Sequence, residues 1–261
     1  CVPILNSADA ASILSYLTDK NATSGERNLD YWDRIFLKAG TLLGDPDAAP
    51  EKQDMVEILS RVMIGREKRI LSLVREYFEL EDLVEIKKRL IGTGFIGGKS
   101  VGMLLARNIL RKDPSFDWSA VMEIHDSFYV GSDIFYSYMV QNGWWKLLMA
   151  QKTDEGYFGV ARELKQKMLH GAFPDEIKEQ FQLMLEYFGQ APIIVRSSSL
   201  LEDAFGNAFA GKYESDFCVN QGTPEERYRH FEEAVRKIFA STMNEDALTY
   251  RLQRGMAQQD E

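Results

Sequence analysis

The sequence predicts an α/β protein, or more narrowly an α+β one, in which a mostly helical N-terminal region precedes a part that mixes strands and helices. Two observations predict this class. Residues 1–90 carry apolar side chains at helical spacing. From residue 91 onward, glycine loops, short β-branched or aromatic runs and helical patterns alternate. The 261 residues are 45% hydrophobic and 27% charged, which suits a globular chain with a sizeable core.

The N-terminal region is expected to form helices whose apolar stripes pack into a core rather than onto a partner. A stretch with glycine and proline, residues 44–50, separates the helical patterns. The expected helices cover residues 8–17, with Ser7 as N-cap, residues 29–43, and residues 55–77, with an interruption at Gly65.

The remainder of the chain alternates between the two periodicities. Pro174 stands where a helix begins, a position that tolerates proline because its missing N–H would be unpaired there. The expected helices cover residues 101–110, 134–140, 159–170, 174–188 and 223–241, and the expected strands end or lie within residues 127–130, 193–195 and 213–219.

Charge and cysteine content limit the functional classes. The formal net charge is −9, which argues against nonspecific binding to nucleic acid or to an anionic membrane, since both use basic patches. Cys1 and Cys218 form neither a disulfide framework nor a metal motif. We therefore expect a cytoplasmic protein, and we read the chain as a piece of a longer polypeptide that begins at Cys rather than Met.

Residues 92–100, GTGFIGGKS, form the first candidate site. Glycines let a backbone approach phosphate closely, the lysine supplies charge, and a following helix N-terminus directs N–H groups outward. The glycines match the GxGxxG dinucleotide fingerprint, but that motif needs a preceding strand, and residues 83–90 look helical. A P-loop would need glycine at Thr93. The other alternative is a glycine-rich helix entry with a solvated lysine.

A second candidate site follows the apolar strand at residues 193–195. Arg196 stands at the exit of that strand, and a turn of three serines follows it. Arginine presents a planar fork of donors that suits phosphate oxygens. The alternative is that Arg196 pairs with Glu202 or Asp203 and that the serines only cap a turn.

Three blocks together resemble the nucleotide-binding domain of the family of phosphoenolpyruvate synthase, pyruvate phosphate dikinase and rifampicin phosphotransferase. Residues 96–102, IGGKSVG, are similar to the glycine-glycine-lysine opening of that domain. Residues 127–135, SFYVGSDIF, resemble the stretch that enters its helical insertion. Residues 195–203, VRSSSLLED, and residues 209–215, FAGKYES, resemble its V-R-S-S-A-T-A-E-D block and F-A-G-Q turn. The resemblance covers roughly residues 91–255.

The resemblance implies an ATP-grasp fold with a mixed sheet, of which residues 91–261 would be the first lobe and residues 1–90 an added helical region. In that family Lys99 and Arg196 would contact the phosphates of ATP, while the loop and strand that carry Gly211 and Ser215 would cover them. The site assigned on this basis consists of Gly97, Gly98, Lys99, Arg196, Ser197, Gly211 and Ser215.

The resemblance also implies what this chain lacks. The ligands for Mg²⁺ and a phosphohistidine domain, which passes the phosphoryl group to pyruvate or a similar acceptor, would lie elsewhere in the parent protein. No catalytic or metal-binding residue is therefore assigned here. His125, His170 and His230 lack the expected sequence context and are read as structural or surface residues. Lys212 replaces the usual glutamine after the F-A-G turn.

Three functions remain open from the sequence. The first is the ATP-binding part of a phosphotransferase, with ATP, the second lobe and the phosphohistidine domain as partners. The second is a nucleotide-sensing or interaction module with the same fold, and the third is a dinucleotide-dependent oxidoreductase. Homo-oligomerisation is compatible with all three. We further predict that Lys99 and Arg196 face one cleft, that residues 1–90 provide no nucleotide ligand, and that this chain alone binds ATP weakly and does not turn it over.

Overall fold

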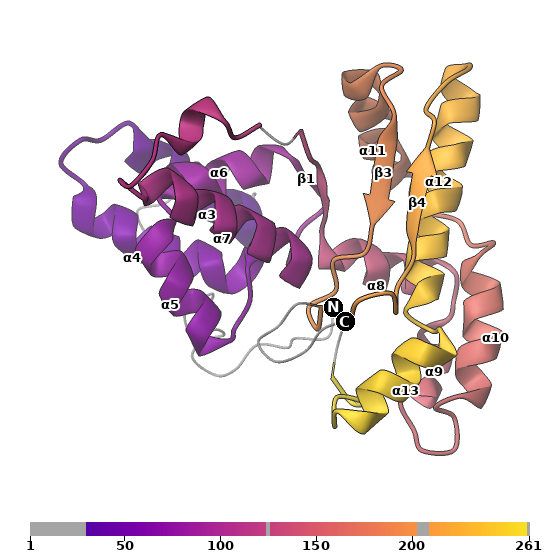
Figure 1. The fold of residues 1–261 in the computed structure, drawn as a ribbon. Coiled ribbons are helices and arrows are strands. Elements are labelled where there is room, and N and C mark those ends of the chain that lie inside the picture. The colour runs from indigo at the N-terminus through magenta and orange to yellow at the C-terminus, as the bar shows by residue number, and fades with distance from the viewer. Residues whose placement is uncertain (1–29, 124–125, 203–208, 260–261) are drawn as a thin grey trace.

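A computed structural model describes residues 30–123, 126–202 and 209–259 (Figure 1). The helix expected over residues 8–17 lies outside the described residues. Four helices form the N-terminal part: α3 (Tyr31–Leu43), α4 (Ala49–Met63), α5 (Lys68–Tyr77) and α6 (Leu80–Lys88). Asp30 caps α3 through Asp33 N, and Glu67 caps α5 through Arg69 N and Ile70 N. The helical N-terminal region is thus confirmed, with the break at Gly65 separating two helices.

The segment before the glycine loop corrects one prediction. Helix α6 ends at Lys88, and a short strand, β1 (Leu90–Ile91), follows it instead of further helix. This strand pairs in parallel with β2 (Tyr129–Val130), and Tyr129 N donates to Arg89 O at 2.8 Å. Both residues of β1 are buried, so apolar burial and strand pairing decide the backbone here rather than the charged pattern that precedes it. Helix α7 (Gly98–Lys112) and the 3-10 turn η1 (Trp118–Ala120) connect the two strands.

The rest of the chain packs helices around a second small sheet. Strands β3 (Ile193–Arg196) and β4 (Ser215–Cys218) pair in antiparallel fashion, with Arg196 opposite Ser215. One face of this sheet packs on α12 (Pro224–Ser241), which begins with a capping box between Thr223 and Glu226. The remaining helices are α8 (Ser132–Gln141), α9 (Trp145–Gln151), α10 (Gly159–Met168), α11 (Asp175–Phe188) and α13 (Glu245–Gln253).

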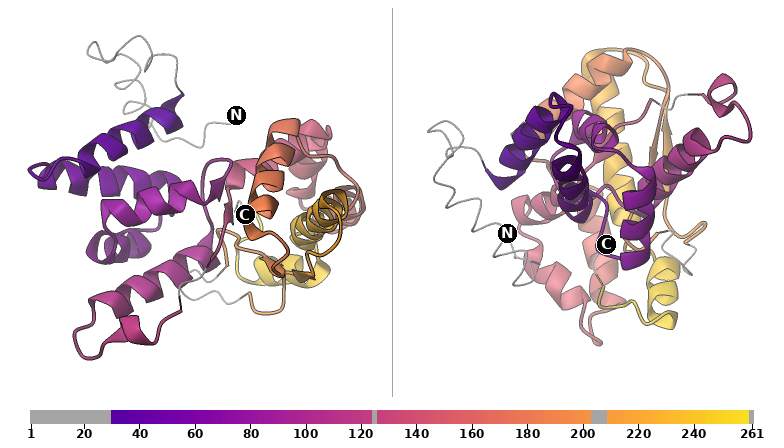
Figure 2. Two further views of the ribbon diagram at one scale, coloured as in Figure 1. Left: turned by 90° about the horizontal axis from the view of Figure 1, so that it is seen from above. Right: turned by 90° about the vertical axis from the view of Figure 1, so that its left-hand side faces the viewer.

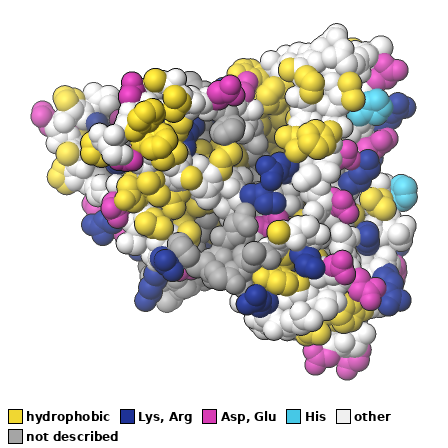
Figure 3. Space-filling model, in the orientation of Figure 1, with side chains coloured by type: hydrophobic (Ala, Val, Ile, Leu, Met, Phe, Trp, Pro, Cys, Tyr) yellow, Lys and Arg dark blue, Asp and Glu magenta, His cyan; other side chains and the backbone are white. Residues whose placement is uncertain are grey.

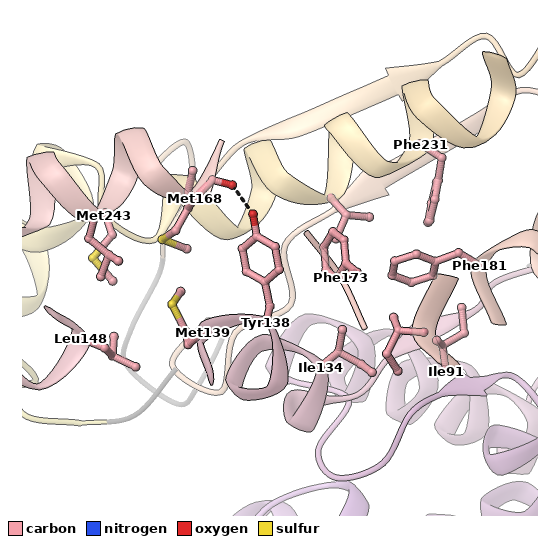
Figure 4. Close-up of a cluster of buried hydrophobic side chains, with 14 of the residues drawn as sticks. Ile91, Ile134, Tyr138, Met139, Leu148, Met168, Phe173, Phe181, Phe231 and Met243 are labelled. Atoms are coloured by element: carbon pink, nitrogen blue, oxygen red, sulfur yellow. Dashed lines mark hydrogen bonds between the residues drawn. The ribbon is translucent and has the colours of Figure 1, made fainter. Parts of the chain in front are cut away.

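The described residues form two large hydrophobic cores, one in each half of the molecule. Figures 1 and 2 show helices α3–α7 in one half and β3, β4 and the later helices in the other. The first core joins α3–α6 to α7, so residues on both sides of position 90 share it. The second core surrounds Tyr138, whose hydroxyl donates to Met168 O, and Figure 4 shows the aromatic rings of Phe173 and Phe181 beside it. The cores meet at β1, where Leu90 belongs to the first and Ile91 to the second.

The α+β prediction is confirmed by this arrangement of helices with two small sheets. The division into residues 1–90 and 91–261 stays a prediction, and the first core crosses that boundary. Among the helices of the described chain, none is long and apolar enough to span a membrane.

Candidate nucleotide site

The start of helix α7 lies directly against the serine turn that follows β3. A Cβ atom on Gly97 would lie 1.4 Å from the carbonyl oxygen of Ser198, and one on Gly98 would lie 1.8 Å from that of Glu202. Gly97 also has a φ of +80°, in the region that favours glycine. The glycines therefore serve a close backbone approach, but the partner they approach is the protein's own serine turn.

Hydrogen bonds close the same contact. Gly98 N donates to Ser199 O at 2.9 Å, and Ser100 N donates to Ser198 Oγ at 3.0 Å. The Ser198 hydroxyl donates in turn to Ile96 O at 2.9 Å. From the sequence we expected the N–H groups at the start of this helix to point outward toward an anion. For Gly98 N and Ser100 N that prediction is wrong, because both donate to the serine turn.

This contact also bears on the dinucleotide reading. A strand does precede Gly92, as the fingerprint requires. However, the fingerprint places a pyrophosphate on the N–H groups at the start of the helix, and here the serine turn accepts from Gly98 N and Ser100 N. The geometry at α7 therefore disfavours a dinucleotide in that position.

Lys99 and Glu202 form an ion pair at the centre of the contact. Lys99 Nζ lies 2.8 Å from Glu202 Oε1 and 3.3 Å from Ser197 Oγ. Glu202 is 1% exposed and accepts further hydrogen bonds from Ser197 Oγ at 3.0 Å and Ser199 N at 3.0 Å. An ammonium group has three donors, so within the described residues one N–H of Lys99 remains for a ligand. Its side chain is 30% exposed.

Arg196 ends β3 with an exposed side chain. Glu202 pairs with Lys99 instead of Arg196, and Asp203, the other carboxylate considered for it, lies outside the described residues. In the described part of the chain, no ion pair or hydrogen bond engages the Arg196 guanidinium. A guanidinium that no described residue engages can bind a phosphate by donating two parallel hydrogen bonds to it.

Ser215 and Gly211 lie on the second strand and the turn before it. Ser215 is exposed and stands across the ladder from Arg196. Gly211 has a φ of +70° and open space around it, in a turn where Lys212 N donates to Phe209 O at 2.9 Å. The fold thus places Ser215 opposite Arg196 in the strand ladder. It also brings Lys99 into contact with Ser197, which is 98 positions away in the sequence.

A cavity of about 350 Å³ begins at this contact. All three sequence blocks line it, through Gly97 and Ser100, through residues 127–132 and Phe135, and through residues 195–200. The lining combines the polar Arg196 and Ser197–Ser199 with the apolar Phe128, Phe188 and Pro192, and Asp126 adds a carboxylate beside Phe128. Lys99 is not among the lining residues but bonds to Ser197, which is. Apolar walls with a few convergent polar groups are typical of small-molecule sites. Figure 3 shows Lys and Arg side chains gathered along the border between the two halves in that view.

Comparison with known families decides the assignment. The model for the family described as pyruvate phosphate dikinase, AMP/ATP-binding domain, matches residues 93–261. The chain belongs to this family. The match contains every residue assigned to the site from sequence, and it leaves out the whole N-terminal helical part, α3–α6. Membership in the pyruvate phosphate dikinase ATP-binding family favours an adenine nucleotide over a dinucleotide.

The relative found among characterised proteins is more distant. Phosphoenolpyruvate synthase of Neisseria meningitidis serogroup B (strain ATCC BAA-335 / MC58) is 32% identical over 102 residues, which are 37% of this chain and 12% of that protein. No solved structure matches the chain. The likeness to the dikinase family therefore covers the ATP-binding domain, whereas the curated relative extends far beyond it.

The structure adds two residues to the site, Ser198, which had no role of its own in the sequence analysis, and Glu202, which was considered only as a partner of Arg196 and pairs with Lys99. Glu202 and Ser198 hold the two motifs together, and the sequence offered only their place in the arginine-serine block as a signal. His170 and His230 are exposed, and His125 lies outside the described residues. Among the described residues, no group of three or more His, Cys, Asp or Glu side chains could hold a metal ion.

Proposed function

We propose that this chain binds the phosphates of ATP between Lys99 and Arg196, as part of an ATP-dependent phosphotransferase. The observation that carries the proposal is the meeting of three separate sequence blocks around one cavity, whose lining includes Arg196, a side chain that no described residue engages through an ion pair or a side-chain hydrogen bond. Ser197 would add a hydroxyl donor beside these cations, whereas Ser215, although opposite Arg196 in the ladder, lines a separate hollow beside β4. Gly97, Gly98 and Gly211 would shape the loops, and the nucleoside would occupy the apolar part of the cavity.

The proposed role of these residues is positioning and charge neutralisation. Phosphoryl transfer depends on both, because charge spreads over the phosphate oxygens in the transition state. Arg196 can offer two parallel donors, and Lys99 can offer a remaining N–H while Glu202 fixes its amine. In the parent protein the phosphoryl group would pass to a histidine on another domain and then to pyruvate or a similar acceptor, as the resemblance of the sequence to the family implies.

Magnesium does not fit the residues described here. The one buried carboxylate at the contact, Glu202, is occupied by Lys99, Ser197 and Ser199. We therefore propose that the ligands for Mg²⁺ come from another part of the parent protein. The reducing cytosol is the proposed compartment, and neither nucleic acid nor membrane is a proposed partner.

A second candidate is a nucleotide-sensing module that keeps the site without turnover. The Lys99–Glu202 ion pair is compatible with either function, because it holds the lysine in place in the absence of any acceptor domain. The two functions differ in the parent chain, where only the enzyme requires metal ligands and a phosphohistidine. A phosphate-release assay on that chain separates them.

Titration of the chain with magnesium-ATP tests the proposal. A charge pair at 4 Å in water contributes on the order of 1 kcal/mol, so two cations in an open site support roughly millimolar affinity after the entropy lost on binding. We expect such weak binding without phosphate release. Arg196→Lys should weaken it although charge is kept, because lysine lacks the forked donors, whereas the exposed control Arg75→Lys should not. An absence of binding or an unaffected Arg196→Lys variant would contradict the proposal, whereas micromolar binding or steady turnover would contradict the expectation that this chain alone is an incomplete site.

A further inference from the structure

A charged aromatic cluster lies where the two halves of the molecule meet. Arg89 follows helix α6, and its guanidinium carbon lies 5.0 Å from the ring centre of Phe128 and 4.6 Å from that of Tyr187. The same guanidinium donates to Asp126 Oδ1 at 2.6 Å and to the Tyr187 hydroxyl at 3.0 Å. Tyr187 also donates to Asp126 at 3.2 Å. Arg89 is thus fixed by two rings and two oxygen acceptors.

This cluster holds one wall of the cavity. Phe128 and Asp126 line the cavity, whereas Arg89 contacts both of them without lining it. Phe128 is further packed edge-on by Tyr187 and Phe188, at 5.3 and 5.4 Å between ring centres. Neighbouring backbone is fixed as well, since Arg89 O accepts from Tyr129 N at 2.8 Å. Movement of Arg89 would therefore move the ring of Phe128.

The position of Phe128 relative to Arg196 in the cavity suggests which part of a nucleotide would contact Phe128. Pro192 and all four residues of β3 line the cavity, so the strand runs along it from Ile193, next to Pro192, to Arg196. Phe128 packs on Phe188, which lies four residues before Pro192 in the chain. Four residues of extended chain span about 13 Å, which is comparable with the length of an extended nucleotide. With the phosphates at Arg196, the base reaches the end formed by Phe128, Phe188 and Pro192.

We propose that Arg89 is a positioning residue that holds Phe128 as the wall against which the nucleotide base packs. The inference rests on the proposed function of the cavity. Lysine would not replace Arg89, because only the planar guanidinium can stack on two rings while its edge reaches Asp126 and Tyr187. Arg89 acts through Phe128 and touches no phosphate in this arrangement, so its effect is confined to the base.

Two probes separate the base from the phosphates. The dissociation constants of magnesium-ATP and inorganic tripolyphosphate are measured with the full chain by protein-observed NMR, which reports millimolar binding. Arg89→Lys and Arg89→Met should weaken ATP binding about fivefold and leave tripolyphosphate binding unchanged. In a Phe128→Ala background, Arg89→Met should add no further loss. Arg61→Met, which removes a surface ion pair with Glu57, is the matched control.

The other possible results contradict either the role of Arg89 or the proposed function of the cavity. Unchanged ATP binding in Arg89→Lys and Arg89→Met, together with a loss in Phe128→Ala, would overturn the role of Arg89. Equal loss for ATP and tripolyphosphate would show that Arg89 is only structural, and a melting temperature for each variant identifies a folding defect. If neither probe responds to Arg196→Lys, the proposed function fails, and the inference fails with it. The milder Arg89→Lys variant keeps the test valid if Arg89→Met does not fold.

Discussion

Replacing Gly97 with alanine puts a methyl group where the carbonyl group of Ser198 already lies. The added carbon would be 1.4 Å from the carbonyl oxygen and 2.4 Å from its carbon. Both atoms belong to backbone, so a side-chain rotation cannot relieve the overlap. Gly97 also adopts φ +80° and ψ 165°, a region that is essentially confined to glycine. Either helix α7 or the serine turn must shift.

The expected loss can be estimated from these two effects. Backbone strain of this kind costs about 1–3 kcal/mol. The shift also breaks the hydrogen bonds from Gly98 N and Ser100 N to the serine turn, each contributing about 1 kcal/mol. We therefore expect Gly97→Ala to lower the free energy of unfolding by about 3 kcal/mol or more. For a domain of this size that corresponds to a fall of roughly 6–12 °C in melting temperature.

Gly102→Ala is the matched control in the same helix. A Cβ atom at Gly102 meets nothing within 4 Å, and alanine favours the helix over glycine by about 1 kcal/mol. Gly102→Ala should therefore be neutral or stabilising. Urea denaturation and thermal melts followed by circular dichroism measure both variants. Equal stability of the two would refute the claim that the glycine loop is shaped by contact with the serine turn.

Three further predictions concern the rest of the molecule. Burial raises the pKa of Tyr138 to about 12, so the folded state keeps a proton that the unfolded phenol loses above pH 10. The free energy of unfolding, measured by urea denaturation, should therefore fall as pH rises from about 10 to 12, and Tyr138→Phe should make that fall shallower. Burial raises the pKa of the Cys218 thiol to about 11. Iodoacetamide at neutral pH should therefore modify Cys218 at least tenfold more slowly in the folded protein than in urea. Equal rates, followed by mass spectrometry, would contradict the burial of this thiol. Removal of residues 1–90 should expose Val101, Leu104 and Leu105 on α7, so the melting temperature of the remaining fragment should be at least 10 °C lower. A cooperative transition at the melting temperature of the full chain would instead support a domain boundary at residue 90.

The fold was predictable wherever apolar spacing and capping residues agree. Residues 29–43 and 223–241 show this, because a clear apolar stripe meets a capping residue, Asp30 or Thr223, at the helix start. Strand β1 was missed because its two residues follow a charged helix and are decided by pairing with β2, which is remote in sequence. Short strands set by tertiary pairing leave no periodic signal.

The site was predictable in composition but not in connection. Lys99 and Arg196 stand out as cations in glycine and serine contexts, so the sequence could nominate them. The sequence could not show that the N–H groups of Gly98 and Ser100 are taken by the serine turn, or that Glu202 takes the lysine. These depend on the docking of two loops that belong to different halves of the molecule. Arg89 gave no signal either, because its partners come from two segments that are remote in sequence, residues 126–128 and the end of α11.

Chemical labelling of Lys99 tests the central claim most directly. An ATP derivative with a lysine-reactive acyl phosphate transfers its acyl group to an amine that lies beside the bound phosphates, and mass spectrometry of peptides identifies the modified lysine. We expect Lys99 to be modified first, excess ATP to suppress the reaction, and Arg196→Lys to reduce it. Modification of Lys99 at the same rate as Lys165 and Lys237, which line a different hollow beside β4, with no protection by ATP, would contradict the account.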